Sequence, residues 1–503
     1  MFDGSKQAPC ESSPGSGPTR TPASSKDHPM TATSTAQDLQ AILQTMKKAQ
    51  RAAGPANADL RRDRLARAAA LLQDNRVALA RAMSDDFGHR AVYHSLTADI
   101  ATTIAALRYS ADHVAEWMVR EEVVTSDSAV KAWIEPQPLG VVGIVSPWNF
   151  PLNLAFSPLA GVLAAGNTAL IKPSELTPNT SDLLADLVGT LFDADELGVV
   201  IGGPDVAQAF TALPFDHLVF TGSGNVGRQV MRAAAANLTP VTLELGGKSP
   251  VVIDEGFDVA VAAERTLTVK TFNAGQICLS PDYVMLPEGA QDAFITAART
   301  FIAGAFPTIQ GNDDYTSVIS DRHFARLVGL IDDAKAKGAS VISLAPAGEP
   351  AYSAETRKIA PVLLLGVDQT MQVMQEEIFG PILPVMTIAG LDQAIDHIND
   401  HDRPLAAYLF ANSQASIERF SAQVTSGALI VNDIMLHASM DALPFGGVGA
   451  SGTGAYHGVH GFRRFSHLKS VVHQGQAGTS GLRLRAPYAQ KQAALEEALA
   501  ARR

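Results

Sequence analysis

Two side chains near the middle of the chain could carry out covalent catalysis, the thiol of Cys278 and the carboxylate of Glu244. The chain has 503 residues and 2 cysteines, and the other, Cys10, lies in a leader rich in Ser, Pro and Gly. A lone cysteine is most often a small buried apolar side chain, yet the neighbours of Cys278 are small and polar. Glu244 stands among β-forming residues just before Gly246-Gly247. A thiol and a carboxylate at element ends beside glycine can serve as nucleophile and base.

Two motifs surround these side chains, Glu-Leu-Gly-Gly-Lys-Ser-Pro at 244–250 and Asn-Ala-Gly-Gln-Ile-Cys at 273–278. With one helix-like stretch between them, they resemble the NAD(P)-dependent aldehyde dehydrogenase family. The resemblance extends from about Asp38 to about Tyr488. Ser-Pro-Asp-Tyr at 280–283 and the glycine-dense stretch 444–457 are most similar to one branch, which includes dimeric medium- and long-chain aldehyde enzymes and bacterial coniferyl aldehyde dehydrogenases.

The resemblance implies a role for each reactive side chain. Cys278 is the nucleophile that forms a thiohemiacetal and then a thioester with the aldehyde. Asn149 and the backbone N–H of Cys278 stabilise the oxyanion, although Asn149 alone could also be a turn residue before Pro151. Glu244 is the general base for thioester hydrolysis. The implied reaction oxidises a hydrophobic aldehyde, either aromatic such as coniferyl aldehyde or medium- to long-chain aliphatic, to the carboxylic acid.

A glycine-rich segment, Gly222-Ser-Gly-Asn-Val-Gly227, has the letters of the dinucleotide fingerprint. It lies between an expected strand, Leu218–Thr221, and a helix expected to begin near Arg228, which is the context that the fingerprint requires. The same rule asks for an acidic residue about 20 positions later, and Glu244 could fill that place by binding the adenosine ribose. Spacing leaves both roles of Glu244 open, and the motifs around it favour the catalytic one.

The resemblance also implies the cofactor contacts. The phosphates lie near the fingerprint and the N-terminus of the following helix, where unpaired N–H groups attract anions. A carboxylate at the adenosine ribose disfavours a 2′-phosphate, so NAD is the expected cofactor and NADP remains open. The expected cofactor-binding residues are Gly222, Ser223 and Gly227 for the phosphates, Lys172 and Glu175 for the adenosine ribose, Glu377 for the nicotinamide ribose, and Trp148 and Phe379 beside them.

The elements that must position these residues alternate between strand and helix. Leu139–Val145 is a continuous apolar strand, typical of a parallel sheet covered on both faces. Such alternation predicts a doubly wound α/β fold. Further strands are expected at Thr168–Lys172, Val199–Ile201, His217–Thr221, Val251–Ile253, Tyr283–Leu286 and Pro361–Leu365, with an exposed strand at Val130–Pro136. Helices are expected at Leu39–Met46, Leu60–Met83, Ile100–Met118, Leu183–Leu191, Val259–Val269, Phe324–Lys337 and Lys491–Ala501.

The expected fold is therefore α/β and aldehyde dehydrogenase-like. A doubly wound Rossmann-type cofactor domain covers residues 36–243. The resemblance implies that it includes a projecting oligomerisation segment at about 122–137, and the sequence alone leaves a plain edge hairpin there equally open. A second α/β domain, the catalytic domain, covers 244–440. Residues 441–503 return to the cofactor domain and form the C-terminal tail, and residues 1–35 form a disordered N-terminal tail.

The bulk composition limits the partners. The chain is 46% hydrophobic and 18% charged, with a net charge of −12, which argues against nucleic acid and anionic membranes because both attract basic surfaces. No apolar run is long enough to span a membrane. Two cysteines cannot form a disulfide framework, so a cytoplasmic location is expected. The expected partners are a small aldehyde and, from the resemblance, a second copy of the chain in a homodimer.

Two other functions stay open on the sequence alone. One is a Rossmann-type alcohol or hydroxy-acid dehydrogenase, for which no convincing catalytic Tyr/Lys or His/Asp pair is found. The other is a non-catalytic protein that kept the fold. His437 is expected near the aldehyde tunnel and could titrate there. The spacing of His457, His460, His467 and His473 fits no metal-ligand pattern, so no metal site is expected.

Overall fold

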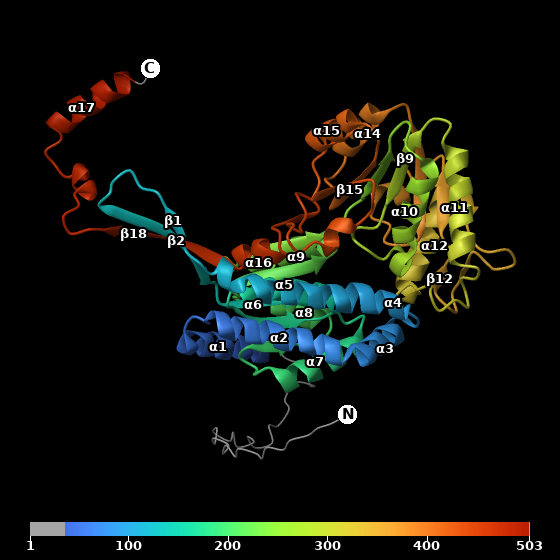
Figure 1. Cartoon of the computed structure of the whole chain (residues 1–503). Helices are drawn as coiled ribbons and strands as arrows, with labels where there is room; N and C mark the ends of the chain where they lie inside the picture. Colours follow the sequence, from blue (N-terminus) through green and yellow to red (C-terminus); the bar gives the residue numbers. More distant parts are fainter. Residues whose placement is uncertain (1–35, 502–503) are drawn as a thin grey trace, which may run out of the picture.

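A computed structural model describes residues 36–501 and arranges them around two large sheets and a projecting arm (Figure 1). The N-terminal tail predicted to be disordered, residues 1–35, lies outside the described residues. None of the helices in the described part has the length and apolar character needed to cross a bilayer. The α/β fold expected from the sequence is confirmed.

The first sheet has six strands in the order β17-β7-β6-β3-β4-β5. The strands are β3 (Val141–Val145), β4 (Thr168–Lys172), β5 (Leu197–Val199), β6 (His217–Gly222), β7 (Val241–Leu245) and β17 (Gly452–Thr453). All are parallel except β17, which pairs antiparallel with β7. The chain starts in the middle at β3, builds outward to β5, and returns to the other side at β6. The strand order therefore reverses between β3 and β6, which is where doubly wound sheets bind ligands.

The second sheet has seven strands in the order β10-β13-β14-β9-β8-β15-β16. The strands are β8 (Pro250–Ile253), β9 (Tyr283–Pro287), β10 (Ser340–Ser343), β13 (Val362–Leu365), β14 (Ile382–Ile388), β15 (Ala406–Phe410) and β16 (Ala428–Val431). Only β10 is antiparallel to its neighbour. Because β7 belongs to the first sheet and β8 to the second, the chain crosses between them at residues 246–249. A small hairpin, β11 (Tyr352–Ser353) and β12 (Lys358–Ile359), lies outside both sheets.

Helices cover the faces of both sheets (Figure 1). Those of the first half are α1 (Ala36–Ala53), α2 (Ala58–Asp74), α3 (Arg76–Phe87), α4 (Val92–His94), α5 (Thr102–Trp117), α6 (Asn153–Ala164), α7 (Pro178–Leu191), α8 (Pro204–Thr211) and α9 (Gly224–Ala235). Those of the second half are α10 (Val259–Thr271), α11 (Gln291–Ala305), α12 (Asp321–Ala336), α13 (Gln372–Gln375), α14 (Leu391–Asn399) and α15 (Gln414–Gln423). The chain returns through α16 (Gly458–Arg464), which packs on α6.

A three-stranded arm projects from the body, and α17 (Ala489–Ala500) lies beyond it (Figure 1). The arm consists of β1 (Glu121–Val123), β2 (Val130–Pro138) and β18 (Ser466–Gln474), with β2 in the centre. The longest pairing, between β2 and β18, runs antiparallel from Pro138 and Ser466 to Val130 and Gln474. No residue of α17 is buried within the chain.

Several predicted bounds were wrong in detail. The helix expected over Leu60–Met83 is two helices, because Asn75 between α2 and α3 leaves helical geometry and its Nδ2 donates to Leu71 O at 2.9 Å. Side chains of this type compete with the helix for backbone groups. The strand expected at Val199–Ile201 is β5, two residues earlier. The helix expected near Arg228 begins at Gly224, so residues 224–227 of the glycine segment are already helical.

Candidate active site

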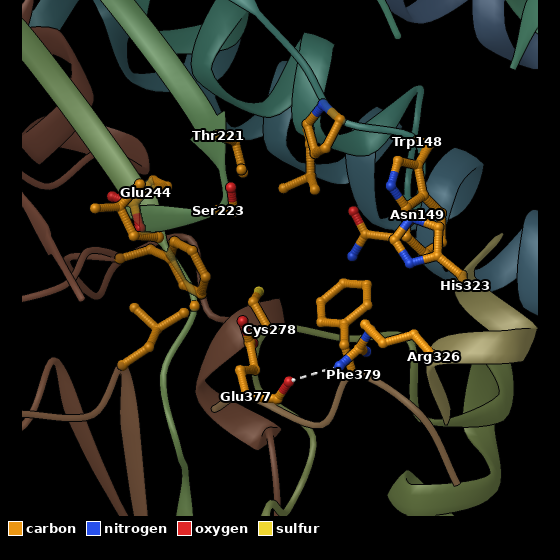
Figure 2. Close-up of a pocket in the computed structure, with 17 residues that line it drawn as sticks. Trp148, Asn149, Thr221, Ser223, Glu244, Cys278, His323, Arg326, Glu377 and Phe379 are labelled. Atoms are coloured by element: carbon orange, nitrogen blue, oxygen red, sulfur yellow. Dashed lines mark hydrogen bonds between the residues drawn. The ribbon is translucent and has the colours of Figure 1, made fainter. Parts of the chain in front are cut away.

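The carboxyl ends of β3, β6 and β7 open into a pocket with a cavity of about 250 Å³ (Figure 2). The pocket contains most of the residues that the sequence singled out, namely Trp148, Asn149, Gly222, Ser223, Glu244, Cys278, Glu377 and Phe379. Pro147, Leu154, Leu405 and Phe445 add apolar walls. The loops after β3 and β6 flank the point where the strand order reverses, so the fold itself brings these distant segments together.

A strained turn carries Cys278 into this pocket. Helix α10 ends at Thr271, and a single 3₁₀ turn, Phe272–Gly275, follows it. Asn273 and Ala274 have positive φ angles of 50° and 53°, and Gly275 follows at 72°. A Cβ on Gly275 would lie 2.4 Å from Gly380 O, so only glycine fits this position. The turn reverses the chain, and Cys278 lines the cavity partly exposed.

The side chain of Gln276 stabilises this turn through hydrogen bonds. This side chain is fully buried, and Nε2 donates to Asn273 O at 3.0 Å and to Ser317 O at 3.1 Å. Its Oε1 accepts from Ile319 N–H at 3.0 Å. A buried amide with both ends satisfied rigidifies its surroundings, so Cys278 is held on a fixed support.

Asn149 is joined to the same support. Its Nδ2 donates to Gln276 O at 3.2 Å, and its backbone O accepts from Asn273 Nδ2 at 3.1 Å. The loop that carries Asn149 is fixed by the buried Asp99, which accepts from Leu152 N–H at 3.0 Å and pairs with Arg90 at 2.8 Å. The amide N–H₂ of Asn149 and the Cys278 turn therefore form one rigid unit.

Asp282 ties three pocket loops together. It forms an ion pair with Lys248, which lies just after Gly246-Gly247. Its Oδ1 accepts from Ile378 N–H at 2.9 Å, and its own N–H donates to Ser249 O at 2.8 Å. The segments that carry Glu244, Cys278 and Glu377 are thereby fixed relative to one another.

The charged groups of the pocket are strongly desolvated. Glu244 is 2% exposed, and neither carboxylate oxygen has a hydrogen-bond partner. Burial raises the pKa of Glu244 well above its ordinary value, and the charge of Arg464 opposes this shift. Burial, reinforced by Asp282, raises the pKa of Glu377 to about 8. Burial and the carboxylates of Glu377 and Glu244 raise the pKa of the Cys278 thiol to about 12, so the thiol is protonated at neutral pH in this state.

The pocket offers a fitting site for a dinucleotide. Ser223 lines the pocket and is the residue before α9, and the first-turn N–H groups of a helix favour phosphate. A Cβ on Gly246 would lie 2.0 Å from Glu377 Oε2, so the Glu377 carboxylate can lie against the backbone only because Gly246 has no side chain. Phe379 and Trp148 meet edge to face, with 5.4 Å between ring centroids.

Three expected cofactor residues lie outside the pocket lining. Lys172 is 1% exposed, its Nζ donates to Pro173 O at 2.6 Å, and the charges of Glu175 and Asp205 act on it. Glu175 is exposed at the end of β4, next to β3 in the sheet. Gly227 lies within α9, where a Cβ would be 2.7 Å from Leu245 Cδ2. Gly227 therefore allows α9 to pack closely on β7.

Sequence reasoning missed two basic side chains of the pocket, His323 and Arg326 on α12 (Figure 2). The His323 ring lies 5.2 Å from that of Trp148, and Arg326 Nη1 donates to Glu377 O at 3.4 Å. Both residues lie on an ordinary amphipathic helix, and no motif marks them. These two side chains reach the pocket because of the way the second sheet packs against the first.

His437, which was expected near the aldehyde tunnel, does not line the pocket and contacts it only through the ring of Phe445. His437 stacks on Phe445 at 5.8 Å and 17°, and His457 stacks on Phe445 at 5.0 Å and 21°. Phe445 lines the cavity, whereas His437 and His457 do not. Burial lowers the pKa of His437 to about 4, so this ring is neutral over the physiological range.

Comparison with known proteins gives a consistent result. The family model described as "Aldehyde dehydrogenase family" matches residues 11–471. A coniferyl aldehyde dehydrogenase from Pseudomonas sp. (strain HR199) is 53% identical over 453 residues, which cover 90% of this chain and 94% of the relative. A probable coniferyl aldehyde dehydrogenase from Caulobacter vibrioides is 49% identical over 453 residues, covering 89% and 93% of the two chains.

Solved structures agree with this result. The substrate-bound state of Staphylococcus aureus AldH superimposes with a TM-score of 0.85 at 34% identity, covering 92% of this chain and 99% of that one. An indole-3-acetaldehyde dehydrogenase from P. syringae, solved in complex with NAD+, gives a TM-score of 0.80 at 27% identity, covering 87% and 89%.

Proposed function

The chain belongs to the aldehyde dehydrogenase family, and we propose that it oxidises aromatic aldehydes of the coniferyl type through a covalent thioester on Cys278. The observation that carries this proposal is the joint placement of Cys278, Glu244 and Asn149 around one pocket with apolar walls. An alcohol dehydrogenase needs no thiol in that place, and a non-catalytic protein needs none of the three.

The chemistry assigned to the chain's own residues follows from their positions. The Cys278 thiol releases its proton to solvent, and its sulfur adds to the aldehyde carbon and creates an oxyanion, which the Asn149 Nδ2–H and the Cys278 backbone N–H stabilise. When bound, the nicotinamide cofactor supplies the hydride acceptor that this oxidation requires. The resulting acyl group is a thioester on Cys278, and Glu244 takes a proton from the water that hydrolyses it. The carboxylic acid then leaves, and the thiol is restored.

The pocket walls support an aromatic substrate. Leu154, Leu405 and Phe445 form apolar surfaces near the reactive thiol, and a flat ring can stack on Phe445. Relatives that are about half identical to this chain are named coniferyl and probable coniferyl aldehyde dehydrogenases. Medium- and long-chain aliphatic aldehydes are also apolar but lack the ring. They are therefore the substrates against which the preference for aromatic aldehydes is measured.

For the cofactor we propose NAD. Its phosphates lie at the N-terminus of α9, Lys172 and Glu175 bind the adenosine ribose, and Glu377 binds the nicotinamide ribose. Glu175 and Asp205 both act electrostatically on Lys172, and two carboxylates near the ribose repel a 2′-phosphate. The related indole-3-acetaldehyde dehydrogenase was solved with NAD+.

For the organisation of the chain we propose a cofactor domain at 36–243, a catalytic domain at 244–440 and a return segment from 441 onward. The crossing from β7 to β8 at residues 246–249 supports this division.

We also propose a homodimer in which the arm of each chain contacts the other chain. For the location of the protein we propose the cytoplasm, which the low cysteine content of the chain favours.

The test is a panel of coniferyl, benzyl-type and medium-chain aliphatic aldehydes with NAD and with NADP, followed by the absorbance of the reduced cofactor. We expect the highest kcat/KM with coniferyl-type aldehydes and NAD. Cys278→Ala should abolish turnover while NAD affinity stays near that of the parent protein, and Cys10→Ala is the matched control that should keep full activity. Turnover by Cys278→Ala would refute the covalent route, and a preference for aliphatic aldehydes would refute the substrate class.

A further inference from the structure

Within residues 36–501, no protein group donates a hydrogen bond to either oxygen of the buried Glu244 carboxylate. A carboxyl group in such a place favours its neutral form, which cannot act as a base. Some nearby group must therefore offset the loss of water if Glu244 is to serve in hydrolysis. This inference rests on the proposed function.

Arg464 is fixed to the strand that carries Glu244. It is the last residue of α16. Its Nε donates to Thr242 Oγ1 at 2.8 Å and its Nη2 donates to Val241 O at 2.5 Å. Side chains two residues apart on a strand point to the same face, about 7 Å from each other. Thr242 and Glu244 therefore face the same side of β7, and the guanidinium anchored on Thr242 lies on the same face of the strand as the carboxylate.

The segment Gly452–Gly454 runs beside β7 and contacts the guanidinium. Gly452 is the pairing partner of Glu244 in the sheet, and Leu245 N–H donates to Ser451 O at 3.0 Å. A Cβ on Gly454 would lie 2.8 Å from Arg464 Nε, so this segment packs directly against the guanidinium. Arg464 itself is only half buried.

The other groups around Glu244 carry no positive charge. The Tyr456 hydroxyl and the Cys278 thiol both respond to the charge of Glu244, and the Tyr456 hydroxyl has no partner. His217 Nε2 lies 2.8 Å from Thr242 Oγ1, and burial lowers the pKa of His217 to about 3, so this ring is neutral. Arg464 is the group whose charge lowers the pKa of Glu244 against the effect of burial.

We propose that Arg464 is a positioning residue for the general base: its guanidinium, anchored on β7, favours the ionised form of the buried Glu244 carboxylate, which is the form that can accept a proton from the hydrolytic water. Arg464 is not among the residues that line the pocket. Its effect is confined to the breakdown of the thioester.

The experiment measures acyl-enzyme formation and decay separately, by rapid quenching and intact-protein mass spectrometry across a range of pH. Arg464→Met should slow thioester decay about tenfold or more at pH 7 and move the pH midpoint of decay upward by about one unit or more, because tenfold corresponds to one pKa unit. The decay rate should recover at higher pH, where the carboxyl group ionises without help. Formation of the acyl-enzyme should stay close to the parent rate, and Arg464→Lys should restore most of the decay rate.

Two controls separate this role from a structural one. Arg357→Met removes another half-buried arginine that donates to a backbone carbonyl, Phe87 O, and it should leave the profile unchanged. In a Glu244→Gln background, Arg464→Met should add no further pH shift. If Arg464→Met does not fold, Thr242→Val loosens the anchor while keeping the charge, and it should shift the midpoint upward by a smaller amount.

The inference is overturned if the decay profile of Arg464→Met, or of Thr242→Val in its place, keeps the parent midpoint, or if decay slows equally at every pH. It is also overturned if the shift persists in the Glu244→Gln background. A parent protein that forms no acyl-enzyme at all would instead refute the proposed function.

Discussion

Asn149 is the residue whose position is most directly tied to the nucleophile. Its side-chain amide donates to Gln276 O and its backbone O accepts from Asn273 Nδ2, so little reorganisation is needed when an oxyanion forms beside Cys278. Preorganised donors of this kind are typically the largest single contribution to acyl-transfer catalysis. The alternative reading, a plain turn residue, predicts no catalytic effect.

Asn149→Ala should therefore lower the rate of the first turnover by about 10²–10³, the usual cost of one oxyanion donor, with cofactor affinity nearly unchanged. Stopped-flow absorbance of the reduced cofactor measures this rate. Asn153→Ala is the matched control, because Asn153 Nδ2 donates to Thr103 Oγ1 at 2.9 Å and points away from the thiol. A loss of less than about tenfold in Asn149→Ala would contradict the oxyanion role.

The Cys278 thiol gives a pH-dependent prediction. Because burial and the carboxylates of Glu377 and Glu244 raise its pKa to about 12, the reactive thiolate is scarce at neutral pH and increases as pH rises. In the Cys10→Ala protein without cofactor, alkylation by iodoacetamide should accelerate about tenfold per pH unit between about pH 7 and pH 9.5, without a plateau. Intact mass against time measures the rate, and a plateau near the ordinary cysteine pKa of about 8.5 would contradict the prediction.

At the scale of elements, the reactive turn depends on a backbone that only glycine can adopt. Gly275 combines a φ of 72° with a Cβ position 2.4 Å from Gly380 O. Gly289 has a similar φ of 83°, but its Cβ position is open. Comparing alanine substitutions at the two glycines therefore separates the effect of backbone strain from the effect of steric overlap.

Gly289→Ala should cost about 1–2 kcal/mol, the penalty of the left-handed region, and should keep activity. Gly275→Ala should cost more and lose most turnover, because the overlap with Gly380 O must displace the turn that carries Cys278. Chemical denaturation gives the stabilities, and steady-state assays give the turnover. Equal losses in the two variants would contradict this account of the turn.

The sequence predicted the elements that carry the motifs. The strand Thr168–Lys172 is confirmed by β4, and the α/β alternation is confirmed by both sheets. Local patterns were sufficient there because the strands are continuous apolar runs. The break at Asn75 was missed because the apolar spacing continues through it. No strand was predicted at the position of β10, and its antiparallel direction is a property of tertiary packing.

The site was predictable only where a motif marks it. Cys278, Glu244 and Asn149 stand in recognisable motifs, and the structure gathers them around one pocket, while their catalytic roles stay predictions. His323, Arg326 and Arg464 carry no motif. Each reaches the pocket or its edge from a surface-like helix position, and only the packing of distant segments gives it a partner.

At the scale of the whole molecule, the arm exposes the features of an interface. β18 is an edge strand of its sheet, and edge strands present unpaired backbone groups to other chains. Leu468 and Val472 on β18 are 47% and 67% exposed. Large apolar side chains on a projecting edge are favourable contacts for a second copy.

We predict that light scattering gives twice the mass of one chain for the parent protein, and a single-chain mass for a variant with Leu468→Glu and Val472→Glu, because two buried like charges oppose pairing. Val77→Glu, at an equally exposed site on α3 (73%), should leave the dimer intact. A single-chain mass for the parent protein at micromolar concentration would contradict the dimer.

In the proposed reaction, Cys278 carries the acyl group and Glu244 promotes its release by hydrolysis. The most direct test of this reaction is intact and peptide mass spectrometry of Glu244→Gln after mixing with coniferyl aldehyde and NAD. We predict a stable mass increase equal to the aldehyde less two hydrogens, located on the peptide that contains Cys278. The absence of such an adduct while aldehyde is still being oxidised, or an adduct at another residue, would contradict the account.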